Sequence, residues 1–510
     1  MLASVKSATP FGIEGLACEV EVDLSPGLPK VVTVGLPDAA VRESQDRVRS
    51  AMRNAGYLFP IQRVTVNLAP ADIKKEGPAF DLPIAIGMLI AHGQLISDRL
   101  KEYAVTGELA LDGRVRPVRG ALAMAMRCAQ EKLRGVIVPA ANAREAAVVE
   151  AIDVIGVEDL IQAVGFLAGK LAIEPTVIDI DQVFAAASRY DEDFSDVKGQ
   201  EAAKRALTVA AAGAHNVLMV GPPGAGKTMV AQRLPSILPP LTLSESLETT
   251  RIYSANGLLR EGQALIATRP FRSPHHTVSS AGLVGGGSTP TPGEISLAHH
   301  GILFLDELPE FGRHTLEVLR QPLEEGRVTI SRAVGALTFP AAFMLVAAMN
   351  PCPCGFHTDP KNECHCTSRM ISNYMSRISG PLLDRIDIQI EMPPVDPKLL
   401  RKQATGRSSD DIRVEVAAAR RLQAERFAGT ALRVNARMSH RDAAKYCRLD
   451  AAGESIMDAA LHQMALSARA HDKILKVART IADLAASPDI QAEHLAEAVN
   501  YRSLDRQLWA

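Results

Sequence analysis

The sequence predicts an α/β protein with several domains, and three observations support this fold class. Short apolar strands alternate with amphipathic helices along most of the chain. A glycine-rich, phosphate-binding pattern follows one of these strands, and residues 439–510 contain helical patterns alone. The 510 residues exceed the usual length of one domain, and a hydrophobic content of 47% supplies sizeable cores.

Residues 1–170 are predicted to form the first α/β domain. "CEVEVDL" (18–24) alternates apolar and polar residues like a half-buried strand, and 30–35 and 63–70 give further strands. A helix is expected over 38–56, because an aspartate precedes an amphipathic run that ends in glycine. Two β elements, at 135–139 and 152–157, complete the domain.

The rest of the chain divides into three segments. Residues 171–192 are predicted to be a linker, 193–395 a second α/β domain, and 396–510 a helical domain. The segment from Lys398 to Arg448 contains 13 Lys and Arg but only 5 Asp and Glu, although the net charge of the whole chain is −2. Such a basic segment is either an electrostatic footprint for nucleic acid or a solvated helical face.

A phosphate-binding loop is the most specific motif in the chain. "GPPGAGKT" follows the apolar strand "NVLMV" and precedes a helical run. Glycines in this pattern let backbone N–H groups wrap the phosphates at a helix N-terminus. We expect Lys227 to reach the β- and γ-phosphates of ATP and the Thr228 hydroxyl to hold Mg²⁺. The predicted nucleotide-binding residues are Gly221, Pro222, Pro223, Gly224, Ala225, Gly226, Lys227, Thr228 and Asp306.

Polar residues follow the next apolar strands. "GILFLDEL" (301–308) ends in two carboxylates, of which Asp306 suits a second anchor for Mg²⁺ and Glu307 suits the group that polarises the attacking water. "FMLVAAMN" ends in Asn350, which can orient that water. Arg385 in "GPLLDRID" is either a structural partner for nearby acids or an arginine that stabilises the γ-phosphate of a neighbouring subunit.

In this order, these motifs and "SARAHDKILKVARTIADL" resemble the AAA+ ATPases of the magnesium-chelatase and minichromosome-maintenance branch. The N-terminal domain, the cysteine-rich stretch and "FRSPHHTVSSAGLVGGG" narrow the resemblance to ComM/YifB-type competence proteins, over essentially the whole chain. The resemblance implies that Asn350 is sensor 1, Arg469 is sensor 2, and Arg385 is the arginine finger, with Arg377 as the second candidate. It also implies a homohexameric ring that drives branch migration and unwinding of DNA during transformation, with a recombinase as a partner.

The first domain resembles the proteolytic domain of Lon proteases, through "KKEGPAFDLPIAIG" and "TGELALDGRVRPVRGALAMA". In those enzymes a nucleophilic serine follows a Gly-Pro pair, and a lysine on the helix after the second block activates it. Ala79 stands at the serine position, and "RGALAMAMR" contains no lysine. A Ser-Lys dyad needs both groups, so we expect a scaffold or a partner-binding module and no peptidase activity.

Two insertions in the ATPase core are candidates for contact with DNA. The first, 271–293, carries Arg272, His275 and His276, and the second, 326–340, is predicted to be a β-hairpin with Arg332 near its turn. Cationic and hydroxyl side chains suit contact with the phosphate backbone of branched or single-stranded DNA, without reading of sequence. With aromatic residues at 4%, base stacking is not expected to contribute. The alternative is that both insertions only pack within the ring.

Four of the seven cysteines lie within the fifteen residues of "CPCGFHTDPKNECHC". Four thiolates suit a tetrahedral structural zinc ion and leave no position open for catalysis. The predicted ligands are Cys352, Cys354, Cys364 and Cys366, with His357 or His365 as substitutes. An unliganded or redox-active cluster is the alternative.

No signal-peptide core is present at the N-terminus, and no uncharged apolar run approaches the ~18 residues of a membrane span. We therefore expect a cytoplasmic protein without a membrane partner, in which clustered cysteines bind metal more often than they form disulfides. Alternative functions are a chelatase-type motor for metal insertion, an ATPase that remodels or degrades protein, and a scaffold. A chelatase motor works with a metal-binding partner that carries a D-x-S-x-S motif, and this motif does not occur in this chain. The intact ATPase motifs argue against a scaffold.

Overall fold

The computed structural model describes residues 2–71, 75, 77–187, 190–287, 290–332, 335–357, 359, 362–395, 406–464 and 467–504. Within it the chain forms two compact units. Unit 1 comprises Met1–Ala186 and Leu243–Ala267, and unit 2 comprises Ala187–Thr242 and Thr268–Ala510. The chain thus passes from unit 1 to unit 2, returns to unit 1 for one segment, and then completes unit 2.

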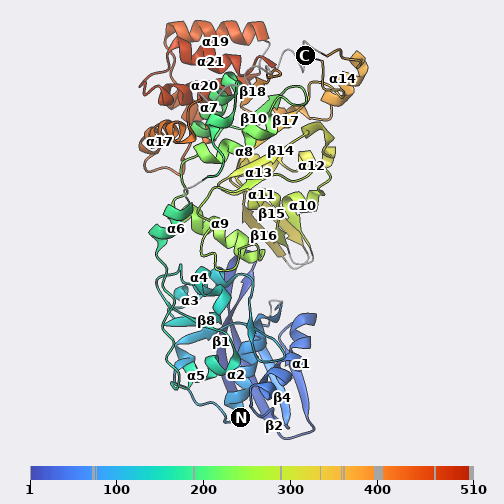
Figure 1. Ribbon diagram of the computed structural model, residues 1–510, viewed down its shortest axis with the longest axis vertical. Helices are drawn as coiled ribbons and strands as arrows, with labels where there is room; N and C mark the ends of the chain where they lie inside the picture. Colours follow the sequence, from blue (N-terminus) through green and yellow to red (C-terminus); the bar gives the residue numbers. More distant parts are fainter. Residues whose placement is uncertain are drawn as a thin grey trace. The chain divides into compact units, whose positions relative to one another are not determined.

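A four-stranded sheet of order β1-β2-β4-β3 organises the first part of unit 1 (Figure 1). β1 and β2 form an antiparallel hairpin, β4 pairs antiparallel with β2, and β3 pairs parallel with β4. The three strands predicted at 18–24, 30–35 and 63–70 are confirmed by β2, β3 and β4. The bounds are β1 Leu2–Phe11, β2 Glu14–Ser25, β3 Lys30–Val34 and β4 Arg63–Ala69.

A second, parallel sheet of unit 1 has the order β5-β8-β9, beside the short hairpin β6-β7. The β elements predicted at 135–139 and 152–157 are confirmed by β8 and β9. The bounds are β5 Tyr103–Val105, β6 Glu108–Leu109, β7 Val115–Arg116, β8 Gly135–Pro139 and β9 Asp153–Val157.

Helix α1 of unit 1 forms where the sequence predicts it. The Asp38 carboxylate accepts a hydrogen bond from the backbone N–H of Val41 at 2.8 Å, which caps the first turn. Gly56, with φ +84°, follows the last turn. A helix, α6, also occupies part of the predicted linker. The helices of unit 1 are α1 Ala39–Asn54, α2 Asp81–Ala91, α3 Ala121–Gln130, α4 Ala143–Ala146, α5 Leu160–Leu167, α6 Ile180–Ala187 and α9 Leu243–Ala255.

Helix α9 belongs to unit 1, although it follows the phosphate loop in the sequence. It packs on α3, and the backbone N–H of Gly120 donates to the Ser254 carbonyl at 3.0 Å. Leu122 of α3 and Leu265, which follows α9, lie in one buried apolar cluster. The ATPase segment therefore contributes part of the core of unit 1.

A five-stranded parallel sheet of order β11-β14-β17-β10-β18 forms the centre of unit 2. The first strand in sequence, β10, thus lies between β17 and β18. In parallel sheets, ligands bind outside the carboxyl ends of the strands at the point where the order reverses. The bounds are β10 Val217–Val220, β11 Phe271–Arg272, β14 Ile302–Leu305, β17 Met344–Met349 and β18 Ile388–Glu391.

Helices pack on this sheet and share its core with the C-terminal helices (Figure 1). The apolar strand predicted before the phosphate loop is confirmed by β10. The helices of unit 2 that precede the C-terminal group are α7 Glu201–Gly213, α8 Lys227–Ile237, α10 Ser280–Val284, α11 Glu294–Leu297, α12 Arg313–Glu317, α13 Arg320–Glu325, α14 Ser368–Met375 and α15 Gly380–Leu383. The C-terminal helices are α17 Ser409–Arg426, α18 His440–Tyr446, α19 Ala451–Met464, α20 Ala468–Leu484 and α21 Ala492–Asn500.

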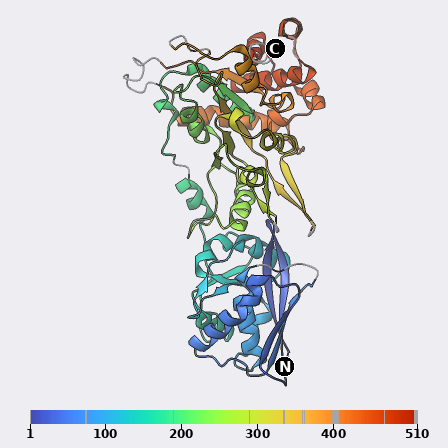
Figure 2. The same cartoon turned by 90° about the vertical axis from the view of Figure 1, so that its right-hand side faces the viewer.

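The predicted hairpin at 326–340 is confirmed by β15 Arg327–Arg332 and β16 Gly335–Pro340, which pair antiparallel. Figure 2 shows this hairpin, in yellow, extending from the body of unit 2. Val328 and Ile330 are buried, whereas Thr329 and Ser331, which alternate with them along the strand, are exposed. A smaller hairpin pairs β12 Gly285–Gly286 with β13 Thr291–Pro292.

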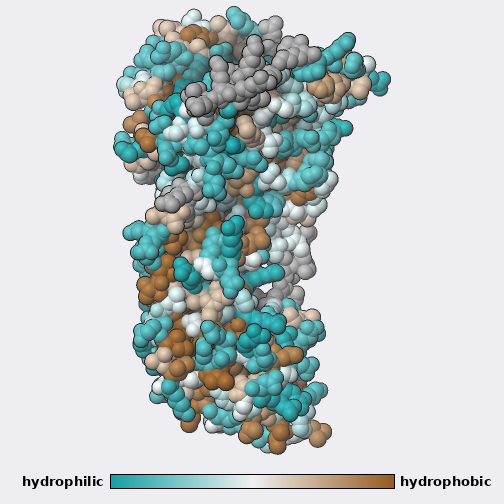
Figure 3. All heavy atoms as spheres, viewed as in Figure 1, coloured by the Kyte–Doolittle hydropathy of each residue, from teal (hydrophilic) through white to brown (hydrophobic). Residues whose placement is uncertain are grey.

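On the face of the molecule in Figure 3, apolar and hydrophilic residues are intermixed. None of the helices formed by the described residues combines the length and the apolar character that a membrane span requires.

Candidate nucleotide site and cysteine cluster

The phosphate loop joins β10 to α8, as the sequence predicts. Gly224 and Gly226 have φ +78° and +87°, a conformation that glycine adopts without steric cost. A Cβ on Gly221 would lie 2.3 Å from the Met392 carbonyl oxygen, so only glycine fits there. Among the residues that the structure describes, no side chain caps the N-terminus of α8, which leaves its first N–H groups free to bind an anion at the loop. The loop therefore has the geometry of an anion-binding helix start.

The Lys227 ammonium lies inside this loop. Its Nζ donates to the carbonyl oxygens of Gly221 and Pro222 at 2.6 and 3.0 Å, and to Asn350 Oδ1 at 3.1 Å. Burial lowers the pKa of Lys227, while Asp306 and Glu307 oppose that shift. The structure thus brings together Lys227 and Asn350, although 123 residues separate them.

Thr228 and Asp306 also meet, since the Thr228 hydroxyl donates to Asp306 Oδ2 at 2.6 Å. Two neighbouring ligands of an octahedral Mg²⁺ lie about 2.9 Å apart, and Mg²⁺ prefers oxygen ligands. This pair of oxygens therefore fits a magnesium ion that is also bound by phosphate oxygens.

Glu307 has an unusual backbone. Its φ is +54°, which for a residue other than glycine costs about 1–3 kcal/mol and is typical of functional sites. Its backbone N–H donates to Asp306 Oδ1 at 3.0 Å. Its carboxylate Oε2 lies 3.4 Å from His276 Nδ1, and His276 also meets the ring of Phe311 edge-on. His276, a candidate for DNA contact, thus touches the predicted catalytic carboxylate.

The other DNA-contact candidates lie in different environments. Arg272 forms a bidentate ion pair with Glu294, at 2.7 and 2.8 Å, so its charge is matched within the chain. His275 is exposed and its ring bonds to the Thr277 hydroxyl at 2.9 Å. Arg332 ends β15, and its side chain lies outside the described part of the structure.

The three predicted arginines contact acids of their own chain. Arg385 pairs with Glu324 and donates to the Pro381 carbonyl, and its side chain is 14% exposed. Arg377 pairs with Glu310 at 2.8 Å and is 51% exposed. Arg469, near the start of α20, donates to Asp384 Oδ2 at 3.0 Å, next to Arg385 in the sequence. The geometry therefore joins the C-terminal helices to the segment that carries Arg385.

A buried polar network strengthens that junction, and no sequence motif indicates it. Asp387 Oδ1 lies 3.3 Å from Lys473 Nζ of α20, and Asp387 Oδ2 accepts from the backbone N–H of Asn216 at 3.1 Å. His215 lies 3.5 Å from Asp387 and bonds to Thr480 at 2.8 Å. In the sequence, this network is indicated only by polar residues that interrupt apolar segments.

Burial alone raises the pKa of Asp387, but Lys473 and His215 hold it well below its usual range. Burial lowers the pKa of Lys473 to about 8, although the Asp387 carboxylate favours the charged form. The pair is therefore stable only while each charge has its partner.

The four clustered cysteines converge. Cys352 Sγ lies 3.3 Å from Cys354 Sγ and 3.8 Å from Cys364 Sγ, Cys354 and Cys364 are 3.6 Å apart, and all four sulfurs lie within 4.8 Å of one another. Four sulfurs at 2.3 Å from a tetrahedral zinc ion are about 3.8 Å apart. A backbone hydrogen bond from Phe356 lowers the pKa of the Cys354 thiol to about 6, whereas burial and the neighbouring sulfurs raise the pKa of Cys364 and Cys366. The cluster therefore fits zinc.

Three family models match successive parts of the chain: "Subunit ChlI of Mg-chelatase" at 20–142, "Magnesium chelatase, subunit ChlI" at 193–400, and "Magnesium chelatase, subunit ChlI C-terminal" at 406–502. The protein YifB of Escherichia coli is 44% identical, over 99% of this chain and 98% of YifB. Competence protein ComM of Haemophilus influenzae is also 44% identical, over 99% of this chain and 98% of ComM. The chain belongs to the YifB/ComM family.

Within this family the chain is a magnesium-chelatase-like AAA+ ATPase, for which ATP and Mg²⁺ are the implied cofactors. The glycine-rich loop, Lys227 and the Thr228–Asp306 pair would hold them. The bound Mg²⁺ would supply charge neutralisation at the phosphates. The residues of this chain would orient the nucleotide, and a hydrogen bond from Lys227 holds Asn350 beside the loop.

Unit 1 of this YifB/ComM family member has a weaker relationship to proteases. Lon protease 1 of Bacillus subtilis is 26% identical over 26% of this chain and 18% of the protease. Ala79 lies in a short 3-10 turn after Gly77, whose φ is +80°, and is 7% exposed. The helix predicted after the second block is α3, whose described sequence is ALAMAMRCAQ. The positions that carry the dyad in Lon proteases thus hold neither a hydroxyl nor an amine.

Proposed function

We propose that this protein is an ATP-driven motor, active as a homohexameric ring, that moves branch points in DNA. The observation that carries the proposal is a nucleotide site whose predicted parts converge, in a chain that matches a competence protein from end to end. Competence is the uptake of DNA, and its integration creates branched intermediates. A motor that moves such branch points suits this setting.

Hydrolysis is assigned to residues in separate roles. Lys227 and the loop bind the phosphates, Thr228 and Asp306 bind Mg²⁺, Glu307 polarises the attacking water and Asn350 orients it. Arg385 is proposed to act on the nucleotide of the neighbouring subunit. Its present partner, Glu324, lies in its own chain, so ring assembly would have to exchange that contact for the phosphate.

Contact with DNA is assigned to the hairpin β15–β16. Its exposed face carries hydroxyl groups from Thr329, Ser331 and Thr338, and Thr329 and Thr338 bond across the strands at 3.0 Å. Hydroxyl groups can bond to phosphate oxygens without reading bases. Arg327, on the same face, supplies a cation, and its ion pair with Glu325 at 3.1 Å is exposed, so it can be exchanged for a phosphate at little cost. The bidentate pair of Arg272 with Glu294 is less exposed, so the hairpin is the better candidate of the two insertions.

A labelled four-way junction incubated with ATP and the wild-type chain tests the proposal. We expect movement of the branch point, faster ATP hydrolysis with DNA than without, and binding that weakens steeply with salt. Replacing Thr329 and Ser331 by alanine should lower the DNA-dependent part of the rate and leave the basal rate intact. Ser455→Ala, at an exposed serine of α19, is the control.

Two results would overturn the proposal. One is a wild-type chain that hydrolyses ATP but moves no junction or fork. The other is an ATPase rate that no DNA changes, in which case protoporphyrin and casein as stimulants would separate the chelatase-like and protein-remodelling alternatives.

A further inference from the structure

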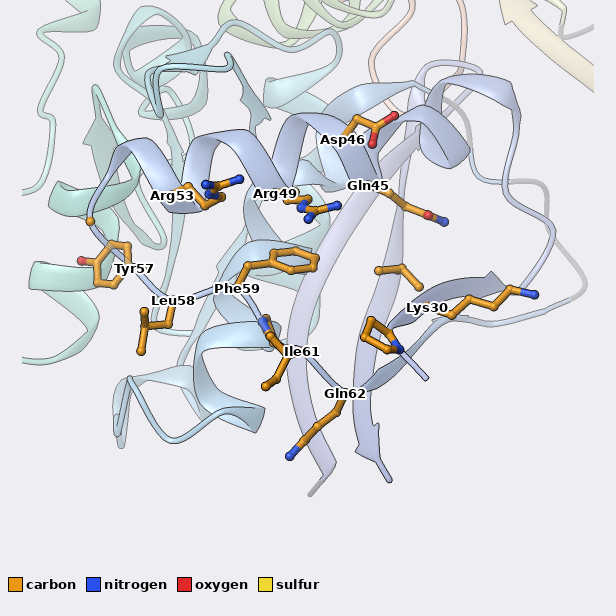
Figure 4. Close-up of a pocket in the computed structure, with 14 residues that line it drawn as sticks. Lys30, Gln45, Asp46, Arg49, Arg53, Tyr57, Leu58, Phe59, Ile61 and Gln62 are labelled. Atoms are coloured by element: carbon orange, nitrogen blue, oxygen red, sulfur yellow. The ribbon is translucent and has the colours of Figure 1, made fainter. Parts of the chain in front are cut away.

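Unit 1 contains a groove of about 760 Å³ on the side of α1, shown in Figure 4. One wall is the face of α1 from Gln45 to Arg53, a second is the start of β3, and the third is the connection from α1 to β4. A volume of this size is typical of sites for small or peptide-like ligands. The lining residues are Pro29, Lys30, Val31, Gln45, Asp46, Arg49, Arg53 and Gly56 to Gln62.

The charge of the groove is positive. The lining residues include three cations, Lys30, Arg49 and Arg53, and one acid, Asp46. No hydrogen bond or ion pair joins these three cationic side chains to another described residue. Arg49 lies above the ring of Phe59, with its guanidinium carbon 5.6 Å from the ring centre. The cations are thus placed but unpaired, so an anionic ligand can bind them without breaking an existing ion pair.

The wall below α1 is apolar. Leu58 and Ile61 are 67% and 80% exposed, and Leu28, which precedes the lining residue Pro29 in the sequence, is 88% exposed. Tyr57 and Phe59 are half-buried and lie on the same connection as Leu58 and Ile61 (Figure 4). Neighbouring exposed apolar side chains of this size mark surfaces that a partner covers.

The third feature is an open strand edge. β3 is the last strand in the order β1-β2-β4-β3, and β4 is its only partner among the strands that the structure describes. Its outer edge therefore offers backbone groups to an added strand, a common mode of peptide recognition. An extended peptide on β3 would place its side chains against the start of the groove at Lys30 and Val31.

We propose that this groove binds an extended acidic peptide segment of a partner protein, with an aromatic or branched aliphatic side chain beside its carboxylates. The carboxylates would pair with Arg49, Arg53 and Lys30, and the apolar side chain would cover Phe59, Leu58 and Ile61. Nucleic acid suits the cations equally, but it gains nothing from a strand edge and little from exposed aliphatic side chains. A peptide uses all three features. This inference does not rest on the DNA-motor proposal.

The test is an array of hexapeptides bound by the full chain. Two positions vary among Asp, Ser and Lys, and two among Phe, Leu and Ser. We expect the peptides that combine Asp with Phe or Leu to bind at least tenfold more tightly than peptides that carry Lys in place of Asp, or Ser at all varied positions. Hydrogen exchange at the amides of residues 30–34 should slow when such a peptide is bound.

The double variant Arg49→Glu, Arg53→Glu should lose at least tenfold in this binding, and its basal ATPase rate should match wild type if unit 2 is intact. The matched control is Arg42→Glu, an exposed arginine of α1 that does not line the groove. Equal binding across the array, or binding that survives the double variant, would overturn the proposal. A different result would assign the groove to nucleic acid instead. In that case a twelve-nucleotide oligothymidylate would bind wild type tightly, the double variant would lose this binding, and acidic peptides would not bind.

Discussion

Lys473→Met tests the junction between α20 and the segment that carries Arg385. The variant keeps the length of the side chain but leaves the Asp387 carboxylate without its cation. Both side chains are about one-tenth exposed, at 11% for Asp387 and 12% for Lys473, so solvent screens the pair weakly. Removing one partner of a buried ion pair costs about 3–5 kcal/mol. We expect the lower end, about 3 kcal/mol, because His215 and the N–H of Asn216 still contact Asp387.

A loss of this size should lower the melting temperature of unit 2 by about 6–10 °C. Calorimetry together with hydrogen exchange at α20 amides would measure it, and Arg441→Met, at an exposed position of α18, is the control. The double variant Lys473→Met, Asp387→Asn should have a free energy of unfolding within about 1 kcal/mol of wild type, because neither charge is then buried without its partner.

The pH dependence follows from the depressed pKa of Asp387. A carboxylate with a lowered pKa in the folded state contributes stability above its unfolded value, about 3.9, and loses that contribution as the pH falls further. The difference between wild type and Lys473→Met should therefore shrink below about pH 4. A single variant that loses under about 1 kcal/mol at pH 7, or a double variant no more stable than the single one, would refute the reasoning.

Three further predictions concern the site. Glu307→Gln should bind ATP normally and hydrolyse it about 10²–10⁴-fold more slowly in a single-turnover assay, because only the water-polarising carboxylate is lost; near-normal turnover would contradict its role. Purified protein should contain close to one zinc per chain by elemental analysis, and Cys364→Ser with Cys366→Ser should lose it; a metal-free, fully active preparation would assign the cluster another purpose. His276→Ala should raise the basal ATPase rate up to about fivefold, because a partly exposed contact at 3.4 Å restrains Glu307 by about 0.2–1 kcal/mol. His462→Ala, at an exposed position of α19, is the control, and a slower His276→Ala enzyme would show that the contact assists catalysis.

The nucleotide site was predictable because its parts are encoded locally. Lys227 and Thr228 lie in one short motif, and Asp306 and Asn350 each follow an apolar strand. Parallel strands bring their carboxyl ends to one edge of a sheet, so local patterns were enough to predict that these residues meet. The cysteine cluster was predictable for a similar reason, since four thiols within fifteen residues can converge without any long-range contact.

Contacts between distant segments were not predictable in this way. The pairing of Asp387 with Lys473 depends on how α20 packs against the core, and the Arg272–Glu294 pair depends on the path of an irregular loop. The contact of His276 with Glu307 likewise needs the pairing of β11 with β14, and β11 is only two residues long. Side-chain charge and periodicity carry no information about which of many partners such residues select.

The placement of α9 in unit 1 has a consequence for synthesis on the ribosome. A nascent chain that has just released residue 186 still lacks α9 and Leu265, so the α3 surface that they cover remains exposed. The core of unit 1 can be completed only after residue 267 has emerged, by which time the phosphate loop has already left the exit tunnel. Chaperone binding to stalled nascent chains should therefore persist until this point in translation. A gene fragment that ends at residue 186 should give a less stable product than one in which residues 243–267 are fused back by a linker.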